Sequence, residues 1–365
     1  MLSRQKITVQ DMCLDGQIKG KNDLRERIAC ALATRVRSVF VDDCGYSPSK
    51  STLHCTGNAS EERFFAKVFL TGSCPIPRRF QSPWDKGADT EVPLRPIRDQ
   101  ISAEWDMTLK MRGISRGEGV PRPLGKSYES RTVVWEEAKG TRLDRVVTRA
   151  RLANATAESG ARGMFLAGRW LRMIHDASIH GEQNLDVGSA ISALERLRSG
   201  KREKESRYLA TASRVLKASV AQSGVSSFSV PIAFTHGDFS LPNLLWGKDA
   251  GQLSVVDFEL CDDRPLCFDL FSLVSDLRAH LLNPFIPKSV IANWERSFWN
   301  GYGPMPAETV LFVNAFALAR VFYHHLPKLL TRKDRRGWVA GANALVYRML
   351  FERFVITHRL PLTAN

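Results

Sequence analysis

The sequence predicts an α+β fold with two lobes, a small lobe built on an antiparallel sheet and a large lobe made mainly of helices. Apolar, β-prone runs are concentrated before residue 139, and apolar residues recur at helical spacing over most of the remaining chain. With 365 residues the chain can hold two cores, and its hydrophobic content of 44% is ordinary for a globular protein.

The small lobe is expected to contain a buried strand followed by a helix. The strand covers residues 63–69, which are mostly apolar and include one lysine, Lys67. Residues 71–100 contain five prolines and are expected to form a non-helical excursion, which could either touch substrate or be an inert insertion. An amphipathic helix is expected to begin at residue 102 and to carry Glu104 in its first turn.

The large lobe is expected to contain six helices, because apolar residues recur there at the spacing of helical turns. These helices cover residues 161–174, 191–220, 268–281, 289–298, 309–328 and 340–354. His324 and His325 fall in the fifth helix and lack a third metal ligand at useful spacing. We expect these two histidines to pack, to lie at the surface or to line a pocket.

The strongest functional signal lies in the segment that begins at His236. The sequence His-Gly-Asp-Phe-Ser-Leu-Pro-Asn starts there, and Leu-Ser-Val-Val-Asp-Phe-Glu follows shortly after it. Residues 244–246 and 253–258 are apolar and β-prone, and the polar residues between them predict a hairpin. Such a hairpin brings Asp257, at its end, back beside Asn243, at its start.

These side chains have the chemistry that magnesium-dependent phosphoryl transfer requires. Mg²⁺ prefers hard oxygen ligands, which Asn243 and Asp257 can supply. Asp238, on the loop before the hairpin, is the candidate catalytic base that orients or deprotonates an attacking hydroxyl. His236 is expected to be structural and to brace this loop by hydrogen bonding rather than to titrate in the reaction.

The same segment resembles the protein-kinase signature His-Arg-Asp followed by Asp-Phe-Gly. It differs in two respects, because Gly237 replaces the arginine and no Ala-Pro-Glu segment follows Asp257. The sequence Pro-Leu-Cys-Phe-Asp-Leu at residues 265–270 instead resembles the aminoglycoside phosphotransferases, choline kinases and related small-molecule kinases. The resemblance implies a two-lobe protein-kinase-like fold, in which residues 1–138 form the nucleotide-binding lobe and residues 139–365 form the catalytic and acceptor-binding lobe. It also implies a kinase that uses ATP and Mg²⁺ to phosphorylate an alcohol group of a small molecule rather than a protein.

The resemblance assigns the nucleotide to the small lobe. Lys67 corresponds to the lysine that holds the α and β phosphates of ATP, and Glu104 corresponds to the helix residue that pairs with this lysine. Residues 132–140 resemble the last strand of the small lobe and the hinge that follows it. Backbone groups near Glu137 and Ala138 would therefore bind adenine.

Three further segments resemble this family. Residues 170–175 are similar to the helix that precedes the catalytic loop, and Asp269 would be a structural brace behind that loop. Residues 42–50 correspond to the turn that covers the phosphates. This segment contains a single glycine, whereas protein kinases have Gly-x-Gly-x-x-Gly there.

Net charge is the main sequence clue to the acceptor. The formal charge of the chain is +14, and from residue 271 onward 12 lysines and arginines stand against 5 acidic residues. Aminoglycosides are polycations that need an acidic pocket, so this charge disfavours them. A phosphorylated or carboxylated sugar, an anionic lipid head group such as that of a glycolipid, or an anionic membrane surface suits the charge better. The basic residues could equally form a solvated surface that binds no partner.

Targeting features predict a cytoplasmic protein. The first residues lack an apolar signal region, and no run of about eighteen apolar residues could span a membrane. The seven cysteines include no Cys-x-x-Cys pair, so we expect neither a disulfide framework nor a zinc site.

Two other classes of function stay open. A nucleotide-binding pseudokinase or scaffold would share the fold without transferring phosphate, although the intact set of Asp238, Asn243 and Asp257 argues against it. Nucleic-acid binding has only the sequence pI of about 9.7 in its favour. Because none of the recognised nucleic-acid modules is present, we expect no specific nucleic-acid binding.

Overall fold

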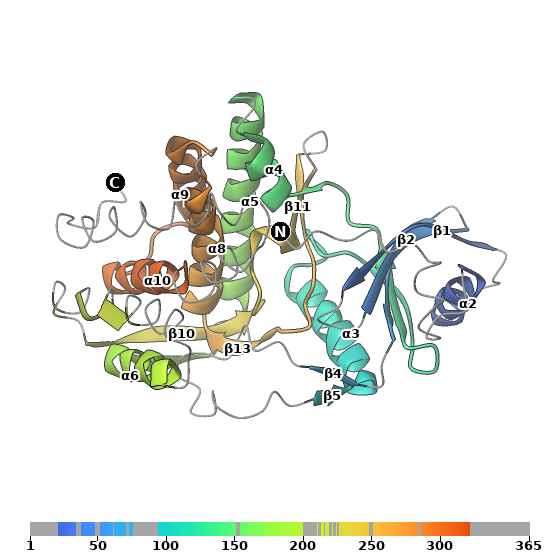
Figure 1. Ribbon diagram of the computed structural model, residues 1–365, viewed down its shortest axis with the longest axis horizontal. Helices are drawn as coiled ribbons and strands as arrows, with labels where there is room; N and C mark the ends of the chain where they lie inside the picture. Colours follow the sequence, from blue (N-terminus) through green and yellow to red (C-terminus); the bar gives the residue numbers. More distant parts are fainter. Residues whose placement is uncertain are drawn as a thin grey trace. The chain divides into compact units, whose positions relative to one another are not determined.

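The chain divides by its internal contacts into two compact units, which we describe separately (Figure 1). The first comprises Met1–Arg79, Glu91–Lys139 and Ser254–Leu260, and the second comprises Phe80–Thr90, Gly140–Leu253 and Cys261–Asn365. The predicted division at residue 138 concerned functional domains and stays a prediction. The structure, a computed structural model, describes residues 21–33, 38–47, 52–60, 62–70, 73–75, 94–150, 154–199, 226–247, 251–283 and 286–321, with a few positions between 210 and 224.

The first unit is built on a five-stranded sheet with the strand order β1-β2-β3-β7-β6. Neighbouring strands pair antiparallel throughout, as the sequence predicted. The central strand, β3, is the strand predicted at residues 63–69. The bounds are β1 (Val39–Ser47), β2 (Thr52–Ala59), β3 (Glu62–Phe69), β6 (Pro123–Ser127) and β7 (Thr132–Glu136).

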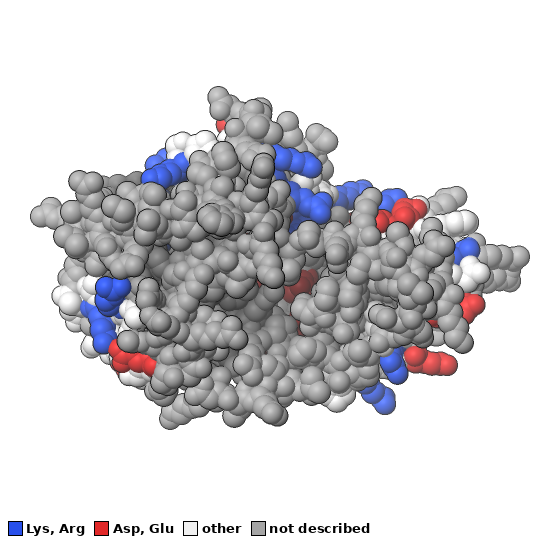
Figure 2. All heavy atoms as spheres, in the orientation of Figure 1, with Lys and Arg blue, Asp and Glu red and all other residues white. Residues whose placement is uncertain are grey.

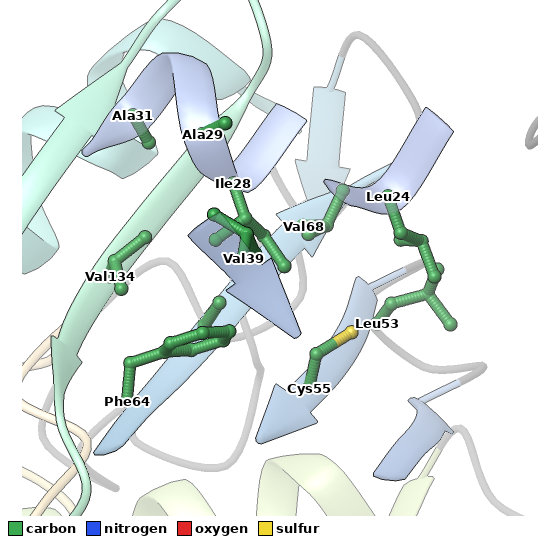
Figure 3. Packing of buried hydrophobic residues seen from close by; sticks show 11 residues of the cluster. Leu24, Ile28, Ala29, Ala31, Val39, Leu53, Cys55, Phe64, Val68 and Val134 are labelled. Carbon is green, nitrogen blue, oxygen red and sulfur yellow. The ribbon is translucent and has the colours of Figure 1, made fainter. Parts of the chain in front are cut away.

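Helix α2 (Lys21–Ala31) packs on one face of this sheet. Figure 3 shows its residues Leu24 and Ile28 in the same cluster as Leu53 of β2 and Val68 of β3. All four side chains are fully buried. Burying an aliphatic side chain of this size contributes roughly 1.5–3 kcal/mol, so this layer holds the helix on the sheet.

Helix α3 (Ile97–Ile114) packs on the other face. Its residues Ile97 and Ile101 belong to a second buried cluster, with Phe69 of β3 and Trp135 of β7. Successive side chains of a strand point to opposite faces of a sheet. Lys67, two residues before Phe69, therefore faces α3.

The start of α3 corrects the sequence prediction, because the helix begins at Ile97 and not at residue 102. Pro96 occupies the N-cap, where no backbone N–H is needed. The negative charge of Asp99 in the first turn interacts favourably with the positive end of the helix dipole. The segment predicted as non-helical also contains two paired short strands, β4 (Ser73–Pro75) and β5 (Leu94–Pro96). Residues 76–93 lie outside the described residues.

The described part of the second unit is mainly helical, as predicted. Five predicted helices overlap α5, α6, α8, α9 and α10, and α4 was not predicted. Most of residues 200–220, the second part of the helix predicted at 191–220, lie outside the described residues. The sixth, at residues 340–354, lies outside the described residues, as do residues 322–328. No described helix is both long and apolar enough to cross a membrane. The bounds are α4 (Leu143–Ala150), α5 (Asn154–Ser178), α6 (Val187–Ser199), α8 (Cys267–Ala279), α9 (Lys288–Tyr302) and α10 (Ala307–Arg320).

Helices α5 and α9 pack closely because each has a glycine where they meet. A Cβ atom added at Gly168 of α5 would lie 2.1 Å from the carbonyl oxygen of Phe298. One added at Gly301 of α9 would lie 2.0 Å from the carbonyl oxygen of Phe165. Neither position can accept a side chain unless one helix moves, so the two glycines set the distance between these helices.

Gly168→Ala should lower the free energy of unfolding by about 1–3 kcal/mol, because the added methyl group overpacks this contact. Gly113→Ala in α3 is the matched control, since a Cβ atom there meets nothing within 4 Å. Alanine is the better helix former by about 0.8–1.0 kcal/mol, so the control should be neutral or stabilising. Urea denaturation of both variants measures the difference, and equal effects of the two substitutions would contradict it.

Two three-stranded sheets complete the described part of the second unit, with strand orders β13-β10-β9 and β12-β11-β8. The predicted hairpin is present as the neighbours β11 and β12. Its second strand ends at Val255 rather than at residue 258, because Asp257 has a φ of 75°, which a strand does not accommodate. The bounds are β8 (Thr141–Arg142), β9 (Gly181–Asp186), β10 (Ser227–Thr235), β11 (Leu244–Gly247), β12 (Gln252–Val255) and β13 (Asp262–Pro265).

Candidate active site

Lys67 lies in the interior of the first unit. On β3 it is opposite His54 of β2 and Val133 of β7. Only 6% of the residue is exposed, and Nζ lies 5.7 Å from the centroid of the Trp135 ring. An ammonium removed from water in this way requires charge partners, because its lost hydration is otherwise not replaced.

Three carboxylates surround the Lys67 ammonium. Nζ donates hydrogen bonds to Oε1 of Glu104 on α3 and to Oδ1 of Asp257, the latter at 2.6 Å. Oε2 of Glu259 lies 4.0 Å away. The predicted contact between Lys67 and Glu104 is therefore confirmed, while the role of this pair in nucleotide binding stays a prediction.

The charges of this cluster do not balance, because one ammonium faces three carboxylates. Burial, together with repulsion from Glu259 and Asp257, raises the pKa of Glu104 to about 8 despite the attraction of Lys67. Burial by itself would lower the pKa of Lys67, but the attraction of the carboxylates outweighs it and raises this pKa. The lysine stays charged, and excess negative charge remains around it.

The same carboxylates could hold a metal ion. One oxygen from each of Glu104, Asp257 and Glu259 lies within 4.8 Å of the others. Among the described residues this is the one group of three or more acidic, histidine or cysteine side chains that is close enough to do so. Gln100, one helical turn before Glu104, donates from Nε2 to Oε2 of Glu259 at 2.8 Å. Hard oxygen donors of this kind suit Mg²⁺ and Ca²⁺.

In the second unit, Asp269 holds the backbone of the loop that carries Asp238. The backbone N–H groups of His236 and Gly237 donate to Oδ2 and Oδ1 of Asp269, at 2.7 and 2.9 Å. Asp269 lies in the first turn of α8 and is fully buried. Gly237 has a φ of 78°, a conformation that favours glycine. This backbone geometry accounts for the glycine that replaces the arginine of the kinase signature.

Side chains from α5 and α9 support Asp269. Nε2 of His175 lies 3.4 Å from Oδ2 of Asp269, and Nδ1 of His175 lies 2.8 Å from the Tyr302 hydroxyl. Burial raises the pKa of Tyr302, so its hydroxyl keeps its proton at neutral pH. His175 can donate to Asp269 while it accepts from Tyr302, which satisfies each of these buried groups. The bracing role of Asp269 stays a prediction, and these are the contacts that such a brace needs.

Asp269→Ala should lower the free energy of unfolding by roughly 2–6 kcal/mol, because two buried N–H groups lose their acceptor at about 1–3 kcal/mol each. Asp263→Ala is the matched control in the same unit, since Asp263 is exposed on β13. That control should change the free energy by less than about 0.5 kcal/mol. Thermal or urea unfolding measures both variants. A loss below about 1 kcal/mol for Asp269→Ala would show that water replaces the carboxylate.

Asp238 is half-buried on this loop, and its backbone makes two hydrogen bonds to nearby residues. Its N–H donates to Nδ1 of His236 at 3.3 Å, and its carbonyl accepts from Nδ2 of Asn243 at 2.9 Å. Through the first contact His236 would brace the loop, a role that stays a prediction. Because Asn243 uses its amide nitrogen in the second contact, its Oδ1 is the atom suited to bind a cation.

Phe239 also anchors the same loop, through contact with helix α5. Its ring stacks on Trp170 of α5, with the ring centroids 5.8 Å apart and the planes within 2° of parallel. Offset aromatic pairs of this kind contribute about 0.5–1.5 kcal/mol beyond their buried area. The loop is therefore held by its backbone, through Asp269, and by an apolar side chain next to Asp238.

The predicted hinge residues follow β7. The N–H of Glu137 donates to the carbonyl of Arg63 at 3.1 Å, and its carboxylate pairs with the Arg63 guanidinium. Its backbone donor is thus already used within the protein, and its predicted role at the hinge stays a prediction. Of the segment predicted to cover the phosphates, residues 42–47 belong to strand β1 and residues 48–50 lie outside the described residues, so the turn itself stays a prediction.

The predicted site residues thus form two groups, one in each unit. Lys67, Glu104 and Asp257 are together in the first. His236, Asp238, Asn243 and Asp269 are together in the second.

Sequence reasoning missed three contributors. Glu259 had a signal, since it replaces the glycine of Asp-Phe-Gly. Gln100 lay in the segment predicted as non-helical, so its position one turn before Glu104 could not be inferred. Tyr302 had no sequence signal, because only the packing of α9 on α5 brings it to His175.

Comparison with known proteins independently indicates a phosphotransferase. A family model described as "Phosphotransferase enzyme family" matches residues 103–309, which is more than half of the chain. A search among curated proteins returns no match.

Solved structures show a similar fold. The amicoumacin kinase hAmiN, solved in complex with AMP-PNP, Ca²⁺ and Ami, matches with a TM-score of 0.53 and 13% identity over 97% of each chain. A choline/ethanolamine kinase family protein from Mesorhizobium loti matches with a TM-score of 0.49 and 14% identity, over 92% of this chain and 98% of that one. Spectinomycin phosphotransferase APH(9)-Ia, in complex with ADP and spectinomycin, matches with 0.47 and 11%, over 90% and 93%. The predicted kinase-like α+β fold is confirmed.

Proposed function

This chain belongs to the phosphotransferase enzyme family, and we propose that it uses Mg²⁺ and transfers the γ-phosphate of ATP to a hydroxyl group of a sugar or glycolipid-type acceptor. As a member of the family it is a phosphotransferase that acts on hydroxyl groups of small molecules. The identity of the donor, of the cation and of the acceptor is the proposal. The amicoumacin kinase of similar fold was solved with AMP-PNP and Ca²⁺, which supports a nucleotide and a divalent cation.

The first unit is proposed to bind the nucleotide. Lys67 would hold the α and β phosphates, since its ammonium is buried and charged and is oriented by Glu104. The backbone of Glu137 and Ala138 would bind adenine. Asp257, and Asn243 of the second unit, are proposed as the Mg²⁺ ligands because each offers a hard oxygen, and the bound ion would offset the charge of the transferring phosphoryl group.

The second unit is proposed to activate the acceptor. Asp238 would accept a hydrogen bond from the acceptor hydroxyl and take its proton as the oxygen attacks phosphorus. The observation that carries this assignment is the anchoring of its loop, in which the two preceding N–H groups bind the buried Asp269. A carboxylate on a backbone held in this way can orient a hydroxyl without first being ordered itself.

The acceptor is proposed to be anionic or neutral rather than a polycation, on the basis of the net charge of +14. On the face shown in Figure 2, lysine and arginine side chains of the described residues occur in separate groups, with acidic side chains among them. The net charge of the protein would attract an anionic acceptor to the molecule as a whole.

A screen of phosphate transfer tests this proposal. Labelled ATP and Mg²⁺ are incubated with the full chain and with aminoglycosides, amino alcohols, sugars, nucleosides and lipopolysaccharide-type glycolipids. We expect transfer to a sugar or glycolipid. Transfer confined to a cationic aminoglycoside would refute the charge argument, and ATP binding without transfer to any class would favour a nucleotide-binding scaffold.

A further inference from the structure

Two cysteine side chains face each other across the first two strands of the sheet in the first unit. Cys44 of β1 is in register with Cys55 of β2, and their Sγ atoms lie 2.7 Å apart. Directly opposed residues of antiparallel strands have Cα atoms about 4.5 or 5.5 Å apart, and disulfides span about 4.4–6.8 Å. We propose that Cys44 and Cys55 are a redox modification site and form a reversible disulfide that ties β1 to β2.

A bulge in β1 produces this pairing. Val41 is opposite Gly57, but the next pair is Asp43 with Thr56, so the register shifts by one residue between them. With a regular ladder, Asp43 would be opposite Cys55. Cys44 would then point to the other face of the sheet, because a shift of one residue reverses every side chain. The irregular strand thus brings the two sulfur atoms to one face.

The two thiols differ in their environment. Cys55 is fully buried in the cluster beneath α2, where Figure 3 shows its sulfur atom, whereas Cys44 is half-buried at the edge of that cluster. The hydrogen bond with Cys44 and burial raise the pKa of the Cys55 thiol. An oxidant therefore meets Cys44 first, and Cys55 is the resolving thiol because it reacts only with its direct neighbour.

The oxidant in this reaction is a low-molecular-weight disulfide, such as oxidised glutathione. The thiolate of Cys44 attacks one sulfur of this disulfide, which forms a mixed disulfide and releases one thiolate. The thiolate of Cys55 then attacks Sγ of Cys44 and displaces the second small thiolate. The protons of the two cysteine thiols pass to the two released thiolates. The protein loses two electrons and the small disulfide gains them, so the exchange is balanced and a small thiol reverses it.

Peptide mapping can detect this bond without any measurement of phosphate transfer. The full chain is equilibrated in buffers of oxidised and reduced glutathione, alkylated and digested with trypsin. Cleavage after Arg37, Lys50 and Arg63 yields peptides 38–50 and 51–63, each with one cysteine. We expect these two peptides to be joined after oxidation and to separate after reduction. The mixed disulfide on Cys44 should be at least about tenfold less abundant, because Cys55 has a high effective concentration beside it.

Three variants decide the assignment. Cys44→Ser should abolish the linked peptides, and Cys55→Ala should abolish them while glutathione accumulates on Cys44. Cys30→Ser is the matched control, because Cys30 is an exposed cysteine of α2 and its loss should leave the linkage unchanged. Circular dichroism verifies that each variant is folded, and Cys44→Ser is the informative change if Cys55→Ala disturbs the core. Oxidised wild-type protein in which both thiols stay alkylable, or in which Cys44 keeps glutathione while Cys55 stays reduced, would overturn the proposal.

Discussion

Asp238→Asn should reduce the turnover number with the acceptor by roughly 10²–10⁴-fold, which is the usual contribution of a general base. Asparagine has the shape of aspartate but carries no charge, so it cannot take the proton of the attacking hydroxyl. Two of the contacts that hold Asp238 involve its backbone N–H and carbonyl, and asparagine retains both. The loop and the affinity for nucleotide should therefore be preserved while the chemical step is lost.

Steady-state kinetics with the acceptor found in the screen, together with calorimetric titration of nucleotide, separates these two effects. Asp263→Asn is the matched control, because Asp263 is an exposed acid of the same unit. It removes the same charge and should leave the turnover number within about twofold of wild type. If Asp238→Asn also stayed within about twofold, Asp238 would not be the base.

Asp257→Asn should weaken the binding of Mg²⁺, so that activity requires a much higher Mg²⁺ concentration. Even the groups that only support a metal ligand usually contribute about 10–100-fold to metal affinity, so loss of a direct ligand should cost at least about 100-fold. Asparagine is the suitable replacement because Asp257 has a φ of 75°. Asparagine accepts this left-handed conformation more readily than most residues, so the substitution changes the charge without straining the backbone.

The measurement is activity as a function of Mg²⁺ concentration, with unfolding in urea as the check on the fold. Asp106→Asn is the matched control in the same unit, since the Asp106 side chain on α3 is 58% exposed. It should titrate with Mg²⁺ as the wild type does. An unchanged Mg²⁺ midpoint in Asp257→Asn would remove this residue from the metal site.

Local sequence predicted those elements that are marked by a simple pattern of apolar and polar residues. The strand with Lys67 was predicted because residues 63–69 form a mostly apolar run with one lysine, and β3 matches it. The hairpin was identified because two β-prone runs flank a polar turn, and β11 and β12 match it. The start of α3 was missed because prolines before residue 97 favoured a non-helical segment, although Pro96 is well suited to the N-cap.

The supporting contacts of the site could not be predicted in this way. His175, Asp269 and Tyr302 come from three different helices, and their contact depends on how α9 packs against α5 at Gly168 and Gly301. Nothing in the spacing of these residues along the chain records that packing. The third carboxylate beside Lys67, from Glu259, likewise depends on a backbone turn at Asp257 that no local pattern specifies.

The amino-acid sequence by itself determined the α+β class and the residues with the chemistry of phosphoryl transfer, because side-chain type and local periodicity are properties of the chain alone. Tertiary structure decided which of those side chains are charged, anchored or paired. Folding places three acidic side chains around the single ammonium of Lys67. A one-residue bulge in β1 places Cys44 opposite Cys55. These outcomes depend on distances between residues far apart in the chain, which only folding brings together.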